Sequence, residues 1–206
     1  DFEFNDWGKY EVIGFMAEKY FAGYKASDFF KRDRSLINDG QLRKVLVDSD
    51  EEKTVTTGSV LALEEGYELR IKQVDLNGNK VYLSLAKDGE EVDSKVVTPS
   101  NDPSDRSSNY LYKVKMGAAK DVPLIAAHVE SVFRSTESDL ATVDGIFQIS
   151  DSPKSVEEGE IHGKMKVDTL DRDEVVMRND GTISLSRGKD VDIMDNLRIQ
   201  IADSDD

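Results

Sequence analysis

Apolar and polar residues alternate most clearly within residues 60–97. Residues 66–74 read Gly-Tyr-Glu-Leu-Arg-Ile-Lys-Gln-Val, which is the pattern of a strand with one buried face. The pair Asn77-Gly78 supplies the positive-φ positions of a tight hairpin turn, and apolar positions alternate again over residues 81–85. A second turn at Asp88-Gly89 leads into another short apolar segment. We therefore predict a meander of short antiparallel strands over residues 60–97.

The second half of the chain has a similar texture over residues 165–201. Short apolar segments flank an Asn-Asp-Gly turn at residues 179–181, and this turn predicts a return strand through residues 183–185. Residues 12–24 and 122–133 fit helical spacing as well as strand spacing. Because aromatic and β-branched residues dominate both segments, strands are favoured. The fold class is predicted to be all-β.

The two halves of the chain also resemble each other. Residues 17–21 (Ala-Glu-Lys-Tyr-Phe) resemble residues 129–133 (Val-Glu-Ser-Val-Phe), and the Val-x-x-Gly of residues 55–58 recurs at residues 156–159. Two further pairs of short segments keep the same order along the chain. Repeated order of this kind indicates an ancient duplication with small insertions.

A segment rich in proline, serine and aspartate separates the halves. Residues 99–107 hold two of the four prolines and almost no apolar residue, which is typical of a linker or long loop. We predict two similar antiparallel β-sandwich subdomains in tandem, the first over residues 1–98 and the second over residues 108–206. A strand exchanged across the boundary is compatible with this prediction.

Charge and composition narrow the classes of function. The 206 residues carry 42 acidic and 27 basic side chains, and the formal net charge of −15 would repel a nucleic acid backbone. Cysteine is absent, which excludes disulfides and thiolate metal sites. No apolar run approaches the ~20 residues that span a bilayer. The chain starts without methionine, so we expect it to be one module of a longer or processed protein.

Motifs for the common enzyme chemistries are missing from the sequence. It contains no Walker loop, no dinucleotide glycine fingerprint, no nucleophile elbow and no His-Glu-x-x-His. The two histidines, His128 and His162, lie in no local pattern with a serine and a carboxylate, so structural or surface roles are expected. We predict that the chain is not an enzyme and has no catalytic, cofactor-binding or metal-binding residue and no cofactor.

Three acidic runs are candidates for cation sites. Residues 75–79 resemble part of a calcium loop, but the glycine is their fourth residue and no bidentate glutamate follows at the twelfth. A hairpin turn is therefore favoured there. Residues 48–52 and 168–174 could hold divalent ions weakly, although solvated turns explain both runs more simply.

The aromatic residues leave a second class of function open. Together, Trp7 and the tyrosines could form a sugar-stacking platform, as in a carbohydrate-binding module. Packing in the core or at interfaces is the more common fate of such residues. The tyrosines are Tyr10, Tyr20, Tyr24, Tyr67, Tyr82, Tyr110 and Tyr112.

A family resemblance is carried by several strings in fixed order. They include VIGFMAEKYFAGY at residues 12–24, LEEGYEL at 63–69, VPLIAAHVESVF at 122–133, DGIFQIS at 144–150 and IMDNLRIQIAD at 193–203. In these strings and their order the chain resembles the S-layer family duplication domain, the duplicated module of surface-layer proteins from methanogenic archaea. The resemblance covers nearly the whole length, and its motifs are structural and not catalytic.

The resemblance implies a secreted structural component of an archaeal cell-surface S-layer. It further implies self-association of identical or tandem modules into a two-dimensional porous lattice, a protective molecular sieve with acidic pores, and a membrane anchor outside this segment. An extracellular carbohydrate-binding or adhesion β-sandwich module is the alternative. The sequence identifies no interface residue, because strand edges and surface patches of many kinds could pair with neighbouring copies.

Overall fold

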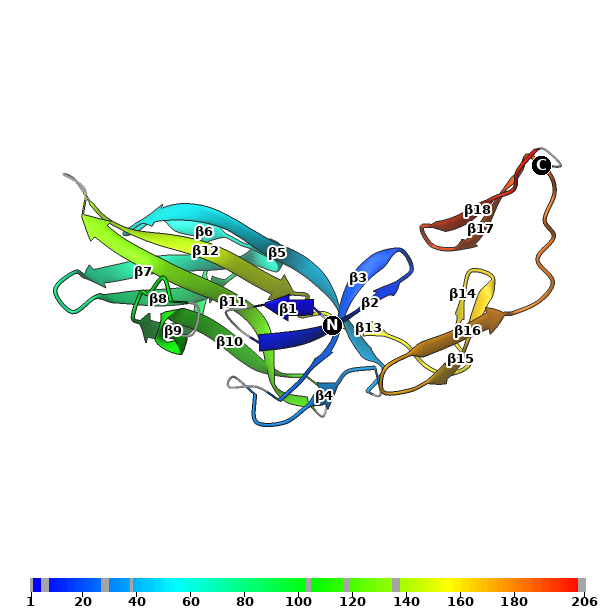
Figure 1. Cartoon of the computed structure of the whole chain (residues 1–206), viewed down its shortest axis with the longest axis horizontal. Helices are drawn as coiled ribbons and strands as arrows, with labels where there is room; N and C mark the ends of the chain where they lie inside the picture. The colour runs from blue at the N-terminus through cyan, green and yellow to red at the C-terminus, as the bar shows by residue number, and fades with distance from the viewer. Residues whose placement is uncertain are drawn as a thin grey trace.

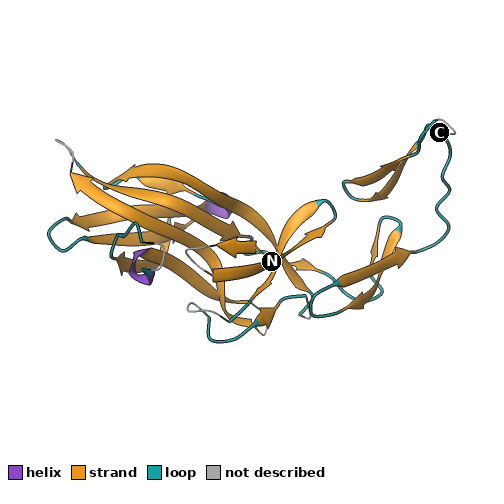
Figure 2. Cartoon of the chain, viewed as in Figure 1, coloured by secondary structure: helices purple, strands orange, loops and turns teal. Residues whose placement is uncertain are grey.

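The structure of the chain, a computed structural model, describes residues 2–4, 8–26, 30–37, 39–102, 105–116, 119–134 and 138–203. Within these ranges the regular structure consists of antiparallel β-strands and two short 3₁₀ turns, η1 (Glu64–Gly66) and η2 (Arg106–Ser108) (Figure 2). The predicted all-β fold class is confirmed, as is the preference for strands over helices in residues 12–24 and 122–133.

The largest sheet has nine strands and carries both halves of the chain. Its order is β1-β2-β3-β5-β12-β11-β10, with β4 paired to β3 and β13 paired to β5 (Figure 1). Long, twisted strands form its centre, and all of its paired strands are antiparallel. The strands are β1 (Phe2–Phe4), β2 (Gly8–Phe15), β3 (Glu18–Tyr24), β4 (Arg34–Ser35), β5 (Gln41–Thr56), β10 (Asn109–Met116), β11 (Ala119–Arg134), β12 (Asp139–Ile149) and β13 (Lys154–Ser155).

The meander predicted over residues 60–97 is a separate four-stranded sheet. It consists of β6 (Val60–Ala62), β7 (Tyr67–Asp75), β8 (Lys80–Lys87) and β9 (Glu90–Val97), in that order. The alternation seen in the sequence selects its buried face, because Leu69 and Ile71 on β7 and Leu83 on β8 are each at most 2% exposed. This face closes a sandwich against the large sheet.

Two smaller sheets complete the C-terminal region, on the right in Figure 1. One contains β14 (Ile161–His162), β15 (Met165–Leu170) and β16 (Val175–Asn179), and the other is the hairpin of β17 (Asp190–Met194) and β18 (Leu197–Gln200). The return strand predicted through residues 183–185 is wrong. These residues belong to an unpaired segment, and Leu185 is 59% exposed. The alternating pattern alone could not make a strand there, because a strand also needs a neighbouring edge with which to pair.

Two hydrophobic clusters hold the sheets together. The larger cluster lies inside the sandwich and joins β7 and β8 to β10, β11 and β12, with Phe147 and Tyr110 fully buried. A smaller cluster joins Phe15 and Met16, around the β2–β3 turn, to Val167 on β15. The β6–β9 sheet therefore packs on the large sheet through one cluster, and the β14–β16 sheet packs on it through the other.

The strand order of the large sheet is symmetrical about the central β5–β12 pair. The antiparallel meander β2-β3-β5 lies on one side, and β12-β11-β10 lies on the other. A glycine turn follows each meander: Gly58 (φ 84°) donates its N–H to the Ile71 carbonyl at 3.0 Å, and Gly159 (φ 87°) donates to the Val167 carbonyl at 2.8 Å. These are the glycines that the Val-x-x-Gly comparison aligned, and their equivalent geometry supports the predicted duplication.

Strands from both predicted sandwiches share this sheet. On β5, from the segment 1–98, Val45 and Thr56 pair with Ile149 and Leu140 on β12, from the segment 108–206. Pairing across the predicted boundary, which the sequence allowed, is therefore present. Two tandem sandwiches are not confirmed, and the division at residues 99–107 stays a prediction.

Candidate assembly surfaces

Both histidines are buried side chains. His128 lies in β11, is 3% exposed, and its Nδ1 pairs with the carboxylate of Asp144 on the neighbouring strand. His162, in β14, packs edge-on against Phe15 with the ring centroids 5.5 Å apart, and its Nε2 lies 3.4 Å from Glu160 Oε2. The interior position of each ring is the one expected for a structural role.

The acidic runs take different forms in the structure. Residues 75–79 form the predicted hairpin turn between β7 and β8, where the Gly78 N–H donates to Asp75 Oδ1 at 3.0 Å. In the run 168–174, the Asp171 N–H donates to the Glu174 carbonyl at 3.0 Å and closes a turn. Among the described residues, no group of three or more histidine, aspartate or glutamate side chains could hold a metal ion.

The interpretation of residues 48–52 as a solvated turn is wrong. They lie inside β5, where residues 50 and 51 together face Gly145 of β12 in a β-bulge. A bulge inserts an extra residue into one strand and pushes side chains out of the ladder without ending the strand. This explains how a run of carboxylates can stay exposed in the middle of a long central strand.

The tyrosines do not form an exposed platform. Each of Tyr10, Tyr20, Tyr24, Tyr67 and Tyr110 is at most 8% exposed. Tyr10, for example, packs against Phe147 with the ring centroids 4.8 Å apart. Buried rings cannot stack on a sugar. Trp7 lies outside the described residues.

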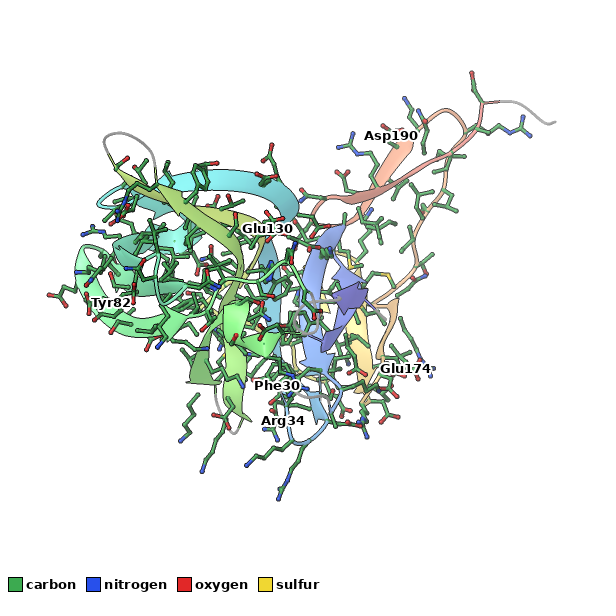
Figure 3. The ribbon with its side chains drawn as sticks, turned by 60° about the vertical axis from the view of Figure 1, so that its left-hand side comes forward. Phe30, Arg34, Tyr82, Glu130, Glu174 and Asp190 are labelled. Atoms are coloured by element: carbon green, nitrogen blue, oxygen red, sulfur yellow. The ribbon has the colours of Figure 1, made fainter. Side chains whose placement is uncertain are left out.

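One apolar patch lies on the outer face of the four-stranded sheet. Tyr82 on β8 faces Val96 on the edge strand β9, and these side chains are 37% and 54% exposed. They border a hollow of about 280 Å³ together with Gln73, Asp75 and Lys80. Figure 3 shows Tyr82 at the margin of the molecule that this sheet forms. The patch is therefore a small apolar surface rimmed by polar side chains.

The sequence carried a signal for this patch. Residues 81–83 are three consecutive apolar residues, Val-Tyr-Leu, within a strand whose buried face takes alternate positions. Because neighbouring side chains on a strand point to opposite faces, Tyr82 had to face outward once Val81 and Leu83 were in the core. The outward position of Tyr82 was therefore predictable from the sequence. That Val96 on β9 lies beside it was not predictable, because this depends on how β8 and β9 pair.

The C-terminal hairpin presents a second exposed edge. Every residue of β18 is exposed, including Leu197 at 39% and Ile199 at 46%. β18 pairs with β17 alone, so one edge of the strand has no neighbour in the described sheets. Such an edge offers unpaired backbone N–H and C=O groups to another strand.

These surfaces occur on a chain whose residues 1–203 match the family model described as S-layer protein. The chain belongs to this family. The resemblance found in the sequence is thereby confirmed, and the chain is a structural S-layer component at the cell surface. The tyrosine burial and the family assignment together do not favour a carbohydrate-binding or adhesion module.

Three relatives of this S-layer family member come from species of Methanosarcina. The Major S-layer protein of Methanosarcina barkeri is 31% identical over 210 residues, which cover 99% of this chain and 29% of the relative. The Major S-layer protein of Methanosarcina acetivorans is 29% identical over 209 residues, covering 99% of this chain and 30% of the relative. The chain thus spans less than a third of the length of these relatives.

Two further properties follow from the family and the structure. The names of the relatives describe S-layer proteins, which indicates a structural role for those proteins. No helix within the described ranges has the length and apolar character needed to cross a membrane.

Proposed function

We propose that this module is a tile that self-associates, with identical or tandem modules, into a two-dimensional porous lattice. The family match over residues 1–203 is the observation that carries the proposal. The exposed patch at Tyr82 and Val96 and the unpaired edge of β18 are surfaces of the kind that such contacts use. Lattice contacts of this kind need symmetry operators that repeat in a plane.

We further propose that the lattice acts as an acidic molecular sieve. A formal net charge of −15 places many carboxylates at the surface, including the exposed residues 50–52 of β5. In pores whose width is comparable to the ~8 Å Debye length of physiological salt, those carboxylates would repel anions and admit cations and small neutral molecules. Nucleic acid is not a partner in this proposal, because the same charge repels phosphate.

The role proposed here requires no reaction. A tile needs stable packing and specific edges, and neither depends on a nucleophile, a general base or a cofactor. The longer protein is proposed to hold the lattice at the membrane through an anchor outside this segment.

Electron microscopy tests the proposal directly. The module, together with its neighbouring segment of the longer protein, is concentrated on a lipid monolayer over a range of salt and calcium concentrations. An ordered two-dimensional array is the expected result, and its diffraction gives the lattice symmetry and pore size. Persistent monomers under every condition would overturn the tile function and revive a surface-binding role.

A further inference from the structure

A basic pocket interrupts the acidic surface of this chain. It has a volume of about 630 Å³, and five of the nine residues that line it are basic against two that are acidic. Figure 3 shows Phe30 and Arg34, two of its residues, at the lower margin of the molecule. The basic residues of the pocket are Lys31, Arg32, Arg34, Lys113 and Lys120.

The pocket is built on an aromatic floor. The buried rings of Tyr24 and Phe30 stack with their centroids 4.1 Å apart, and the ammonium of Lys113 lies 4.7 Å from the centre of the Phe30 ring. The Tyr24 hydroxyl donates to the Lys120 carbonyl at 3.3 Å, which ties β3 to the start of β11. These contacts bring together the three separate parts of the chain that carry the basic residues of the pocket.

The two acidic residues of the pocket leave its positive charge in excess. Asp33 accepts a hydrogen bond from the Ala26 N–H at 2.7 Å and pairs with Arg172 at 3.1 Å, outside the pocket lining. The Ala26 N–H and then Arg172 hold the pKa of Asp33 below its ordinary value, so this carboxylate is already satisfied. Burial lowers the pKa of Lys113, and the second acidic residue of the lining, Asp121, acts against that shift. Arg34 pairs with Asp39, outside the lining, at 3.0 Å, so Lys31, Arg32 and Lys120 carry the excess positive charge.

A complementary acidic feature lies on β5, and we call it the acidic bulge (residues 49–52). Its residues Asp50, Glu51 and Glu52 are all exposed, and two of them are displaced from the ladder opposite Gly145. The Glu51 N–H donates to Ser49 Oγ at 3.2 Å, so a local hydrogen bond helps to shape the bulge. The bulge therefore presents three adjacent carboxylates on a well-defined strand.

The basic pocket and the acidic bulge lie on different elements of the molecule. In Figure 1, part of β5 reaches the upper margin, whereas β4, next to the pocket, lies at the lower margin. Two complementary patches at separate places on one chain allow a head-to-tail contact, which repeats from copy to copy instead of closing a dimer. A contact that propagates in this way is what one row of a planar lattice requires.

We propose that the basic pocket of one copy binds the carboxylates of the acidic bulge of a second copy. This inference rests on the proposed tile function and adds to it the chemistry and direction of one contact. Strong like charge opposes association of the tiles, so a local region of opposite sign sets where they meet. The aromatic floor shields the basic groups on one side and strengthens their attraction for a carboxylate.

A peptide titration tests the binding step without requiring assembly. The probe is a capped peptide with the sequence of residues 47–53, and the control is the same peptide with asparagine and glutamine replacing its acidic residues. Chemical-shift changes of the monomeric chain at Lys31, Arg32 and Lys120, with the acidic peptide only, are expected. Inorganic phosphate is titrated separately, and a response to phosphate without one to the peptide would overturn the proposal in favour of a free-anion site.

Charge-reversal variants test the contact between copies. The double variant Lys31→Glu/Arg32→Glu should weaken both peptide binding and self-association by at least about tenfold. The variant Lys164→Glu/Lys189→Glu makes the same change in net charge at two exposed residues away from the pocket and should retain peptide binding. Association of the pocket variant should return when it is mixed with a copy carrying Asp50→Lys/Glu51→Lys.

The pocket contact and the tile function can be told apart by experiment. Peptide binding at the pocket without any array would remove the tile function and leave the pocket as a carboxylate site. Arrays that form equally well from wild type and Lys31→Glu/Arg32→Glu would keep the tile function and refute the pocket contact.

Discussion

At the scale of single residues, Asp151 joins the two sheets of the sandwich. It follows β12, and its carboxylate accepts hydrogen bonds from Lys87 on β8 and from the Tyr67 hydroxyl on β7, the latter at 3.2 Å. Its own N–H donates to Glu65 Oε2 at 2.8 Å, and its carbonyl accepts from the buried Arg43. No pattern in the sequence pointed to this junction, because its members are far apart along the chain.

We expect the contribution of Asp151 to stability to depend on pH. Partial burial acts to raise the pKa of Asp151, but Lys87 and then Tyr67 and Ser152 outweigh it, and the pKa of Asp151 lies below its ordinary value. A carboxyl with a lowered folded-state pKa stabilises the fold above its unfolded pKa, and that contribution is lost as the pH falls through the folded value. Asp151→Asn should therefore be less stable than wild type at pH 7 in urea unfolding.

The difference in unfolding free energy should begin to narrow below pH about 4, the ordinary value for an unfolded aspartate, and should close at lower pH. Asp180→Asn, at an exposed position in the turn after β16, serves as the control and should match wild type throughout. A gap between Asp151→Asn and wild type that is constant with pH would exclude the charge as its cause.

At the scale of elements, the docking of the β17–β18 hairpin depends on Gly163. This glycine has a φ of 62°, and a Cβ placed there would lie 2.4 Å from the Ile193 carbonyl oxygen and 2.7 Å from Met194 Cα. Beside it, the Lys164 N–H donates to the same Ile193 carbonyl at 2.7 Å. A two-stranded hairpin is marginal by itself, so this close backbone contact matters for its stability.

Gly163→Ala should loosen the hairpin. The positive φ and the backbone clash should together cost more than about 1 kcal/mol of local stability. Amide hydrogen exchange in β17 and β18 should speed up, while exchange in β11 and β12 stays as in wild type. Gly181→Ala is the matched control, because a Cβ there meets nothing within 4 Å. Equal exchange in the two variants would show that the contact at Gly163 does not hold the hairpin.

Local patterns predicted individual elements better than they predicted partners. Alternation and the Asn77-Gly78 turn identified β7 and β8, since both signals act within a few residues. The same alternation predicted a strand at residues 183–185, but this segment pairs with no neighbouring strand. The sequence also did not predict the bulge in β5, because a bulge depends on the strand that lies opposite.

At the scale of the whole molecule, we propose that the two predicted sandwiches exist in an exchanged form. The β6–β9 sheet from residues 1–98 packs in one cluster with β10–β12, and Val167 from the second half packs with Phe15 and Met16 from the first. In this arrangement each half supplies strands to cover the core of the other. The duplication and the division at residues 99–107 are then compatible with a single continuous sheet.

Fragment complementation checks this exchanged arrangement. Residues 1–98 and 108–206, produced separately, should each lack a cooperative unfolding transition, because each leaves the apolar face of its strands uncovered. Mixing equal amounts should restore the near-ultraviolet circular dichroism of the intact chain. Two fragments that each unfold cooperatively alone would instead establish independent sandwiches.

The net charge should make self-association of the chain depend on salt concentration. Copies with a charge of −15 repel one another, and raising the salt from about 0.01 M to about 0.15 M shortens the Debye length from about 30 Å to about 8 Å. Charges in direct contact are screened less than distant ones. Self-association, measured by sedimentation, should therefore strengthen over this range. Dissociation on adding salt would show that repulsion between the net charges of the copies does not limit their association.

The sequence by itself determined what depends on neighbouring residues: the strands, the hairpin turns, the all-β class and, through ordered strings such as residues 12–24 and 122–133, the family. Tertiary structure decided the rest. Only the pairing of β5 with β12 created the acidic bulge, and only the fold brought residues 30–34 together with Lys113, Lys120 and Asp121 as a basic pocket. The physical reason is that many strand edges and charged segments have equivalent local patterns, and long-range packing selects which of them meet.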